Sequence, residues 1–368
     1  MNRETTAVIT LVLALTLAGT LMVFSALGYR ENGGAEITRQ FAALGLGLAA
    51  MLIAARFDYH RLKDGFIFRG IVLGSLVLLV LVLLIGPEVK GAQRWIRVAG
   101  MQLQPSEIAK FALILLLAVK LTDNREQLKK FFAGFVPPAV IAVLFAGLVL
   151  AERDLGVPVL MVGVAGIMMA VAGVSMRYLL MSLVPLAAAF VALIFSSPHR
   201  VERIMAFRNP WHDPLDTGFN LIQSYSAFAQ GGLWGKGAGA SEQKLGYLPE
   251  SHTDFVFALL GEEFGLAGTL TVVLLFAGLL YAGYRIAINA RDMFGAMLAT
   301  GIVSLICMQA AIIMGVTIGL FPTKGLPLPY ISYGGTALIV FLGLAGVLAN
   351  VGMQGQEPTA SGRRAAAA

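Results

Sequence analysis

The sequence contains few charged residues for its length. Of its 368 residues, 13% are Asp, Glu, Lys or Arg, whereas 58% are hydrophobic and the mean hydropathy is +0.80. Soluble domains carry about 25% charged residues, and a soluble fold of this size could not cover so much apolar surface with so little charge. The composition therefore argues against a soluble protein and predicts a membrane protein.

The chain is equally poor in residues that form disulfides or bind metals. Its one cysteine, Cys307, lies inside an apolar run, and a single cysteine can build neither an internal disulfide nor a thiolate metal site. The four histidines, His60, His199, His212 and His252, show no metal-ligand spacing. No segment reads GxxxxGKS or GxxxxGKT, so we do not expect ATP to drive its chemistry.

Long apolar runs dominate what is present. A run of about 20 apolar residues spans a bilayer as a helix, and we predict an all-α integral membrane protein with about ten transmembrane helices. The expected spans lie near residues 7–28, 40–55, 67–86, 107–121, 133–151, 156–174, 178–197, 255–283, 295–320 and 336–353. The first run is too long for a signal peptide, so it should be retained. Residues 1–353 then form a single membrane domain, and residues 354–368 are expected to be a disordered tail.

An even number of spans places both termini on one side, and the distribution of positive charge indicates which. Cytoplasmic connections are enriched in Lys and Arg. With the N-terminus in the cytoplasm, most Lys and Arg residues of the short connections fall on the inner side, among them Arg3, Lys130 and Arg285. This spread accounts for the net charge of +6 better than a nucleic-acid partner does, and we expect no nucleic acid.

The segment 198–254, between the seventh and eighth expected spans, is then a long extracytoplasmic loop. Loops of this length without a function are uncommon. Its first part, His199 to Arg208, suits an amphipathic helix lying on the membrane interface, and Phe219 to Gln230 suits a second helix. Several glycines follow in residues 231–239, which predicts a flexible or tightly turned stretch.

The end of this loop reads LPESHTD, and Asp254 is followed at once by an apolar run. A carboxylate at that boundary is partly desolvated, which raises its basicity and suits a general base. An Asp that precedes a helix can equally serve as its N-cap. The two roles are compatible, and position alone leaves both open.

A second polar segment, QPSEIAK at 104–110, opens the fourth span. Ser106 is a plausible N-cap. Glu107 and Lys110 are three residues apart and share one helix face. Charges inside a membrane are costly and mark either a functional site or a mutual ion pair that stiffens the helix bundle; both remain open here.

Two further outer connections carry charge. Residues 152–154 read Glu-Arg-Asp and form either an ordinary solvated turn or part of a polar cluster with Lys110. The Gly- and Pro-rich segment 324–335 is either a shaped loop that adds the cation of Lys324 to the same mouth or a simple turn between helices.

Glu262 and Glu263 lie about two turns into the eighth span. Paired acids share a proton or bind a cation, which would suit a transporter, although a structural network with loop arginines fits equally well. Together, the outer segments offer carboxylates for proton transfer and cations for an anion. That combination suits a substrate with a phosphate head and a lipid tail.

These segments resemble the SEDS family of bacteria, named for shape, elongation, division and sporulation, and most closely its rod-shape member. The resemblance covers nearly the whole chain. It rests on GAQRWI at 91–96, QPSEIAK at 104–110, the stretch from Arg200 through DPLDTGFNLIQS, GGLWGKG at 231–237, LPESHTDFVFALLGEEFG at 248–265 and GLPLPYISYGG at 325–335.

The resemblance implies a peptidoglycan glycosyltransferase of the bacterial cytoplasmic membrane that polymerises lipid II, for elongation and rod shape, with a class B penicillin-binding protein, a transpeptidase, as partner. Asp254 corresponds to the family's essential acid. Some relatives carry Arg where this chain has Gln102, which weakens the assignment of a diphosphate-binding cation there. The substrate-binding residues that we expect are Arg39, Gln104, Glu107, Lys110, Asp154, Arg200, Arg203, Lys244, Glu250, Ser251 and His252.

In the mechanism that follows from the resemblance, Asp254 deprotonates the 4-hydroxyl of the acceptor sugar, which attacks the anomeric carbon of the donor with inversion. Arg200, Arg203, Lys110 or Lys244 would neutralise the leaving diphosphate, and a divalent cation, Mg or Mn, could assist. No residue of this chain is predicted to ligate it. Two alternatives are a lipid II flippase or transporter, against which the lack of internal repeats argues, and a non-enzymatic scaffold for the transpeptidase.

Overall fold

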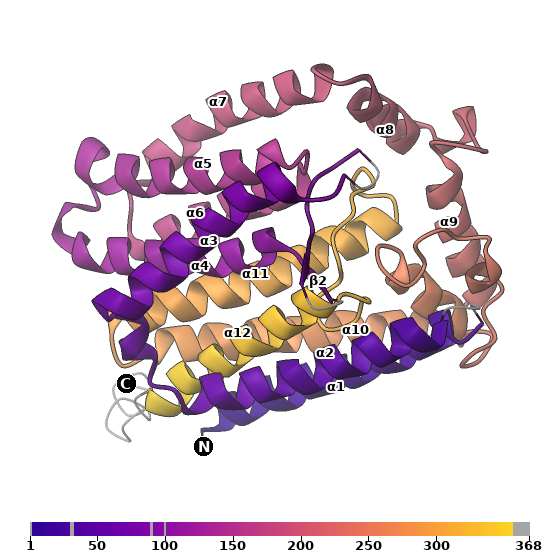
Figure 1. The fold of residues 1–368 in the computed structure, drawn as a ribbon, viewed down its shortest axis with the longest axis horizontal. Coiled ribbons are helices and arrows are strands. Elements are labelled where there is room, and N and C mark those ends of the chain that lie inside the picture. The colour runs from indigo at the N-terminus through magenta and orange to yellow at the C-terminus, as the bar shows by residue number, and fades with distance from the viewer. Residues whose placement is uncertain (1, 30–32, 89–90, 99–100, 356–368) are drawn as a thin grey trace, which may run out of the picture.

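The structure is a computed structural model that describes residues 2–29, 33–88, 91–98 and 101–355. The described residues form twelve α-helices and a two-stranded hairpin (Figure 1). The helices are α1 Arg3–Leu27, α2 Gly33–Arg56, α3 Gly65–Ile85, α4 Pro105–Asp123, α5 Val136–Ala151, α6 Gly156–Ala172, α7 Met176–Phe195, α8 Pro198–Arg208, α9 Phe219–Gly231, α10 Val256–Ile288, α11 Met293–Thr317 and α12 Gly335–Gln354. The strands are β1 Ile96–Val98 and β2 Met101–Leu103.

Each of the ten expected spans corresponds to one helix, and the prediction of an all-α membrane fold is confirmed. Within the described chain, eight helices are long and apolar enough to cross a membrane. The other two are α6, which has 17 residues, and α4, which is interrupted by charged side chains such as Lys110. The expected start of the second span was wrong, because α2 begins at Gly33 and places Arg39 inside the helix as an exposed residue.

Burial separates central from peripheral helices. In the apolar windows of α11 and α12, 72% of residues are buried inside the protein, against 6% in α7. Leu17, Val77 and Val184 are among the large apolar side chains that stay exposed on the peripheral helices, each at more than 60%. Lipid tails can cover such surface whereas water cannot without cost. Figure 1 shows α7 along one edge of the bundle, continuing into α8.

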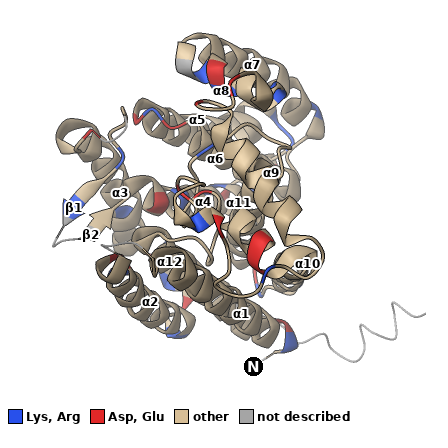
Figure 2. Cartoon of the chain, turned by 90° about the vertical axis from the view of Figure 1, so that its right-hand side faces the viewer, with Lys and Arg blue, Asp and Glu red and all other residues tan. Residues whose placement is uncertain are grey.

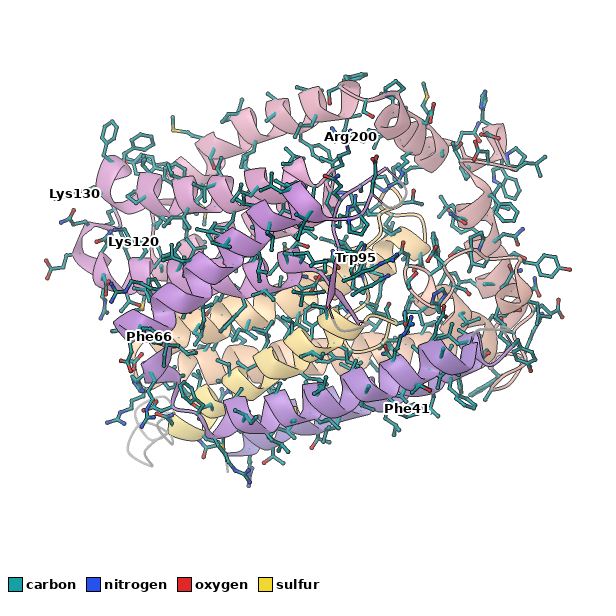
Figure 3. The ribbon with its side chains drawn as sticks, in the orientation of Figure 1. Phe41, Phe66, Trp95, Lys120, Lys130 and Arg200 are labelled. Atoms are coloured by element: carbon teal, nitrogen blue, oxygen red, sulfur yellow. The ribbon has the colours of Figure 1, made fainter. Side chains whose placement is uncertain are left out.

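The bundle has two distinct ends. The Asn2 side chain donates to the Gly352 carbonyl at 3.3 Å, so α1 starts where α12 finishes. We call this the terminal end; Lys120 and Lys130 lie there in Figure 3, whereas Arg200 lies toward the other end. The second end, which we call the loop end, carries α8, α9 and the start of α10 (Figure 1). The expected alternation of connections between two ends is therefore present.

The connection between α7 and α10 contains two helices, α8 and α9, as predicted. Its glycine-rich part lies against a break in α10, where Gly265 has φ 64° and the helical hydrogen bonds are interrupted. Lys236 and Gly237 donate backbone N–H groups to the carbonyls of Glu262 and Glu263 at 3.0 Å, and Leu266 donates to Gly232 at 2.9 Å. The loop thus replaces the hydrogen bonds that the helix loses, as buried backbone groups require.

The β1–β2 hairpin was not predicted. The strands pair antiparallel with Ile96 opposite Leu103, and the Thr336 hydroxyl at the start of α12 donates to the Gln102 carbonyl at 2.6 Å. Two three-residue strands give too short a pattern to stand out between apolar spans. Of the expected tail 354–368, all but the first two residues lie outside the described part of the chain.

Candidate functional site

A cavity of about 330 Å³ opens at the loop end, which faces the viewer in Figure 2. It lies between the connection before β1, the turn between α5 and α6, the ends of α7 and α8, and the connection after α11. Five cationic residues line it: Arg94, Arg153, Arg200, Arg203 and Lys324. Phe190 and Ile194 of α7 add an apolar wall. The cavity therefore combines positive charge with a surface on which a lipid chain could rest.

Asp154 is the carboxylate of the cavity wall, and three neighbours fix it. Its Oδ1 accepts the backbone N–H groups of Gly156 at 2.7 Å and Val157 at 3.3 Å, so it caps the start of α6. Its Oδ2 lies 3.4 Å from the Arg94 guanidinium. Asp154 is 5% exposed. Of the two alternatives left open for this turn, a polar cluster forms, but its cation is Arg94, because Lys110 pairs with Glu107 and Gln309.

Asp254 borders the same cavity. A Cβ atom on Gly325, which lines the cavity, would come within 3.2 Å of the Asp254 Oδ2, so the carboxylate packs directly against that backbone. Desolvation and the nearby Arg94 lower the pKa of Arg203, and the charges of Asp254 and Asp154 partly offset this. Arg203, which lines the cavity, is thus close enough to both carboxylates to interact with their charge.

Lys324 also belongs to this electrostatic group. Burial lowers the pKa of its ammonium, and Asp154 partly counteracts the effect. Lys324 lines the cavity, so segment 324–335 adds a cation to it, as one of the two interpretations of that segment expected. An ammonium held at reduced hydration gains more from an incoming anion than a fully solvated one does.

The turn before α10 holds Asp254 in place. Glu250 has φ 55°, and its carbonyl accepts the N–H groups of Thr253 and Asp254, each at 3.1 Å. The Ser332 hydroxyl donates to the Thr253 carbonyl at 2.5 Å. The N-cap position of α10 belongs to Phe255, which makes no side-chain capping bond. The interpretation of Asp254 as the N-cap was therefore wrong, since the helix begins one residue later.

Two other expected residues of this turn are buried beside the loop after α11. Ser251 is 0% exposed and His252 8% exposed. The His252 ring lies 5.6 Å from the Tyr333 ring between centroids, and the His252 carbonyl accepts the Tyr333 N–H at 2.9 Å. These contacts join the 250–255 turn to the 325–335 loop, so the two segments are fixed relative to each other beside Asp254.

Glu107 and Lys110 form a buried ion pair inside the bundle. The Lys110 Nζ lies 2.9 Å from the Glu107 Oε1 and donates to the Gln309 Oε1 at 2.8 Å. The Gln309 amide in turn donates to the Pro327 carbonyl at 2.7 Å. The N-cap of α4 is Gln104, with Pro105 as the first helical residue, so the expected N-cap at Ser106 was wrong. The pair reaches the 325–335 loop through Gln309 rather than lining the cavity.

A second buried network holds the glycine-rich loop to α10. The Lys244 Nζ lies 3.1 Å from the Glu263 Oε1 and also donates to the Ser25 hydroxyl at 2.9 Å. Glu262 accepts from Lys236 at 3.2 Å and from the Ser241 hydroxyl. The expected network therefore forms with lysines rather than arginines, and Lys244 is not among the residues that line the cavity.

Of the expected substrate-binding residues, the cavity brings together Asp154, Arg200 and Arg203, with Asp254 at its border. Glu250, Ser251 and His252 support Asp254, while Gln104, Glu107, Lys110, Lys244 and Arg39 lie elsewhere. Sequence reasoning missed Arg94 as a site residue. Its one signal was its place in the block GAQRWI. Within the described ranges, no three His, Cys, Asp or Glu side chains gather to hold a metal ion.

Comparison with known proteins gives a consistent family assignment. The family model of FtsW, RodA and SpoVE, described as "Cell cycle protein", matches residues 5–357. The probable peptidoglycan glycosyltransferase FtsW of Geobacter metallireducens is 43% identical over 95% of both chains. The stage V sporulation protein E of Bacillus subtilis is 39% identical over 94% of this chain and 95% of its own.

Solved structures share the fold. A chain from "Structural coordination of polymerization and crosslinking by a peptidoglycan synthase complex" has a TM-score of 0.80 and 29% identity over 94% of this chain and 96% of its own. The rod shape determining protein RodA of Thermus thermophilus has a TM-score of 0.72 and 27% identity over 95% and 97%. The expected special likeness to the rod-shape member is not confirmed, because the relatives of higher identity carry division and sporulation names.

Proposed function

This chain belongs to the FtsW/RodA/SpoVE family of cell cycle proteins, and we propose from that membership that it is a peptidoglycan glycosyltransferase that polymerises lipid II. The observation that carries the proposal is the placement of one carboxylate, Asp254, at the border of a cavity lined by five cations. An inverting transfer from a lipid diphosphate needs a base beside the acceptor hydroxyl and positive charge beside the leaving diphosphate.

In the proposed reaction, Asp254 accepts the proton of the acceptor sugar's 4-hydroxyl as that oxygen attacks the anomeric carbon of the donor. The bond to undecaprenyl diphosphate breaks, and the α-linkage becomes β. Negative charge then accumulates on the leaving diphosphate, where Arg94, Arg203 and Lys324 can stabilise it. These cations converge from three separate connections, so the site is preorganised by the fold.

The apolar wall suits the rest of the substrate. Phe190 and Ile194 of α7 border the cavity, and α7 has no buried residues of its own. A polyprenyl tail attached to a diphosphate in the cavity could therefore pass along α7 into the lipid. Holding donor and acceptor in line beside Asp254 supplies the rest of the rate enhancement.

The orientation that we propose places both termini in the cytoplasm of a bacterial cell and the cavity outside the cytoplasmic membrane. Support comes from charge at the terminal end, where Lys120 and Lys130 lie in Figure 3. The connections at that end hold many of the chain's cations, in accord with the positive-inside rule.

For the cellular role, we propose septal or sporulation wall synthesis in place of rod elongation. The support is the identity of 43% and 39% to proteins named FtsW and stage V sporulation protein E. A class B penicillin-binding protein is the proposed partner, in keeping with the similarity to a chain of a peptidoglycan synthase complex.

The proposal is tested with purified protein, lipid II and a gel that resolves glycan polymer. Asp254→Asn keeps the shape of the side chain but removes its basicity, so polymer formation should fall at least about a hundredfold. Asp216→Asn, at an exposed position of the same connection, is the matched control and should retain wild-type activity.

The same preparations separate the alternatives. A flippase would move lipid II across liposomes without polymer in either variant, and a scaffold would support polymer only through its partner and would tolerate Asp254→Asn. Polymer made by folded Asp254→Asn at the wild-type rate would refute the assignment of the base.

A further inference from the structure

Glu152 is a buried carboxyl that the proposed reaction does not use. It follows the last residue of α5 and is 1% exposed. Within the described chain, neither of its side-chain oxygens has a hydrogen-bond partner. An ionised carboxylate in that setting is strongly disfavoured because burial removes water without supplying donors.

Two charged groups that interact with Glu152 come from different segments of the chain. Asp154 contributes a second carboxylate from the start of α6, and Arg94 contributes one guanidinium from the connection before β1. The Arg94 side chain is already committed, since it donates to the Arg153 carbonyl at 2.6 Å and lies 3.4 Å from the Asp154 Oδ2. One arginine therefore stands between two carboxyl groups and pairs with only one of them.

Two further cations of the cavity, Arg203 on α8 and Lys324 on the connection after α11, also interact with Asp154. Its negative charge raises the pKa of each against the effect of burial. The five cations that line the cavity face two carboxylates, Asp154 and Asp254, while Glu152 is neutral, and the excess of positive charge is available to an anion. Ionisation of Glu152 adds a third carboxylate beside Arg94 and reduces that excess.

We propose that Glu152 holds a proton while the cavity binds the diphosphate of its lipid-linked substrate, and that loss of this proton weakens binding of that anion. Glu152 is then a positioning residue that sets the charge available from Arg94. The inference rests on the proposed function and adds to it a pH-dependent control of substrate affinity.

The expected pH range follows from the surroundings of the carboxyl. Burial raises the pKa of Glu152 to about 8, Asp154 adds to the increase, and Arg94 opposes it. At pH 9, about one unit above that value, roughly one molecule in ten keeps the proton. If only the protonated form binds well, affinity for the diphosphate should fall roughly tenfold between pH 7 and pH 9.

The test measures KM for lipid II against pH with the purified full chain. Wild-type KM should rise roughly tenfold from pH 7 to pH 9. Glu152→Gln, which mimics the protonated acid and cannot ionise, should keep a low KM throughout. Glu88→Gln is the matched control: Glu88 is exposed on a neighbouring connection, 3.7 Å from Arg153, and its variant should follow the wild-type profile.

A second readout does not need turnover. Inorganic diphosphate should raise the Tm of the wild type more at pH 7 than at pH 9, and should raise that of Glu152→Gln equally at both. The ionisation of inorganic diphosphate also changes with pH, but it changes equally for every variant. A difference between variants in the Tm shift therefore reflects ionisation of the protein. A wild-type KM that stays flat from pH 7 to pH 9 overturns the proposal without reference to any variant.

The outcomes distinguish a failure of the proposed role of Glu152 from a failure of the proposed function. If wild type makes polymer and its alkaline profile coincides with that of folded Glu152→Gln, the role of Glu152 is refuted and the proposed function stands. If inorganic diphosphate protects the protein as expected but no polymer forms under any condition, the charge control stands and the polymerase assignment is refuted.

Discussion

At the residue scale, the site is built from backbone conformations that few side chains adopt. Three non-glycine residues of the described chain have positive φ: Arg153 at 60°, Glu250 at 55° and Tyr330 at 67°. Such conformations cost of order 1–3 kcal/mol each and persist where the surroundings enforce them. Arg153 precedes Asp154, Glu250 opens the turn of Asp254, and Tyr330 lies in the loop that packs on that turn, so the strain is concentrated around the proposed acid and its cavity.

The cation opposite Asp254 gives the first residue-scale prediction. Arg203→Gln removes a guanidinium that faces Asp254 and Asp154. Charge-assisted hydrogen bonds contribute about 1.5–3 kcal/mol, so we expect KM for lipid II to rise by about tenfold or more. Arg208→Gln, on the same helix but not among the residues that line the cavity, should leave KM within about twofold. Steady-state polymerisation kinetics check both, and equal effects of the two variants would contradict a specific role of Arg203.

The Glu107–Lys110 pair gives a second prediction, about stability. Lys110→Met would leave Glu107, 0% exposed, as an unpaired buried charge. Removing one member of a buried pair costs about 3–5 kcal/mol, whereas replacing both with neutral residues of similar size is much better tolerated. We therefore expect a large fall in Tm for Lys110→Met in detergent, and recovery of most of it in the double variant Glu107→Gln with Lys110→Met. A double variant no more stable than the single one would show that the pair does not act as a unit.

At the element scale, the break in α10 is the feature that gives the glycine-rich loop its place. A Cβ atom on Gly265 would lie 2.6 Å from the Leu233 carbonyl carbon and oxygen, and φ 64° already disfavours any other residue. Without the break, the carbonyls of Glu262 and Glu263 would return to helical bonds, and the loop would lose its acceptors.

This geometry predicts the effect of one methyl group. Gly265→Ala should lower the free energy of unfolding by at least about 1–3 kcal/mol, through strain and loss of loop contacts. Gly278→Ala lies in the same helix, where the nearest atom to the new Cβ would be a Leu11 methyl at 3.3 Å, and alanine is the better helix former by about 1 kcal/mol. Thermal unfolding with both variants should show destabilisation only for the first. Equal Tm values would mean that the break is not needed for loop packing.

The elements also show how far sequence reasoning reaches. Apolar run length predicted a helix at each expected span, because hydrocarbon selects helices strongly. The ends were less predictable: Gly33, Gln104 and Phe255 start or cap helices where the pattern favoured other residues, since caps depend on local backbone geometry. Likewise, Arg94 and Asp154 are distant in sequence and meet only because two connections at the loop end pack together. Asp254 and Arg203 were predicted from motifs, but their shared cavity is a tertiary feature.

At the scale of the whole molecule, the cavity and the lysines that support the proposed orientation lie at opposite ends of one bundle. The cavity lies at the loop end, whereas Lys120 and Lys130 lie at the terminal end (Figure 3). Positive charge near the ends of spans retains those connections in the cytoplasm. In the orientation that we propose, this asymmetry directs the cavity outward, where a lipid-linked sugar donor would be used without ATP.

Orientation can be tested through single cysteines in a Cys307→Ala background. Leu215→Cys, at a position 88% exposed in the connection that carries α8 and α9, should react with a membrane-impermeant maleimide in intact spheroplasts. Lys130→Cys, exposed at the terminal end, should react only after the membrane is permeabilised. Both variants should first be shown to make polymer, so that the labelled protein is the folded one. The reverse pattern would put Asp254 in the cytoplasm. A polymerase that assembles the wall outside the cell could then not use this cavity, even if every contact described above were correct.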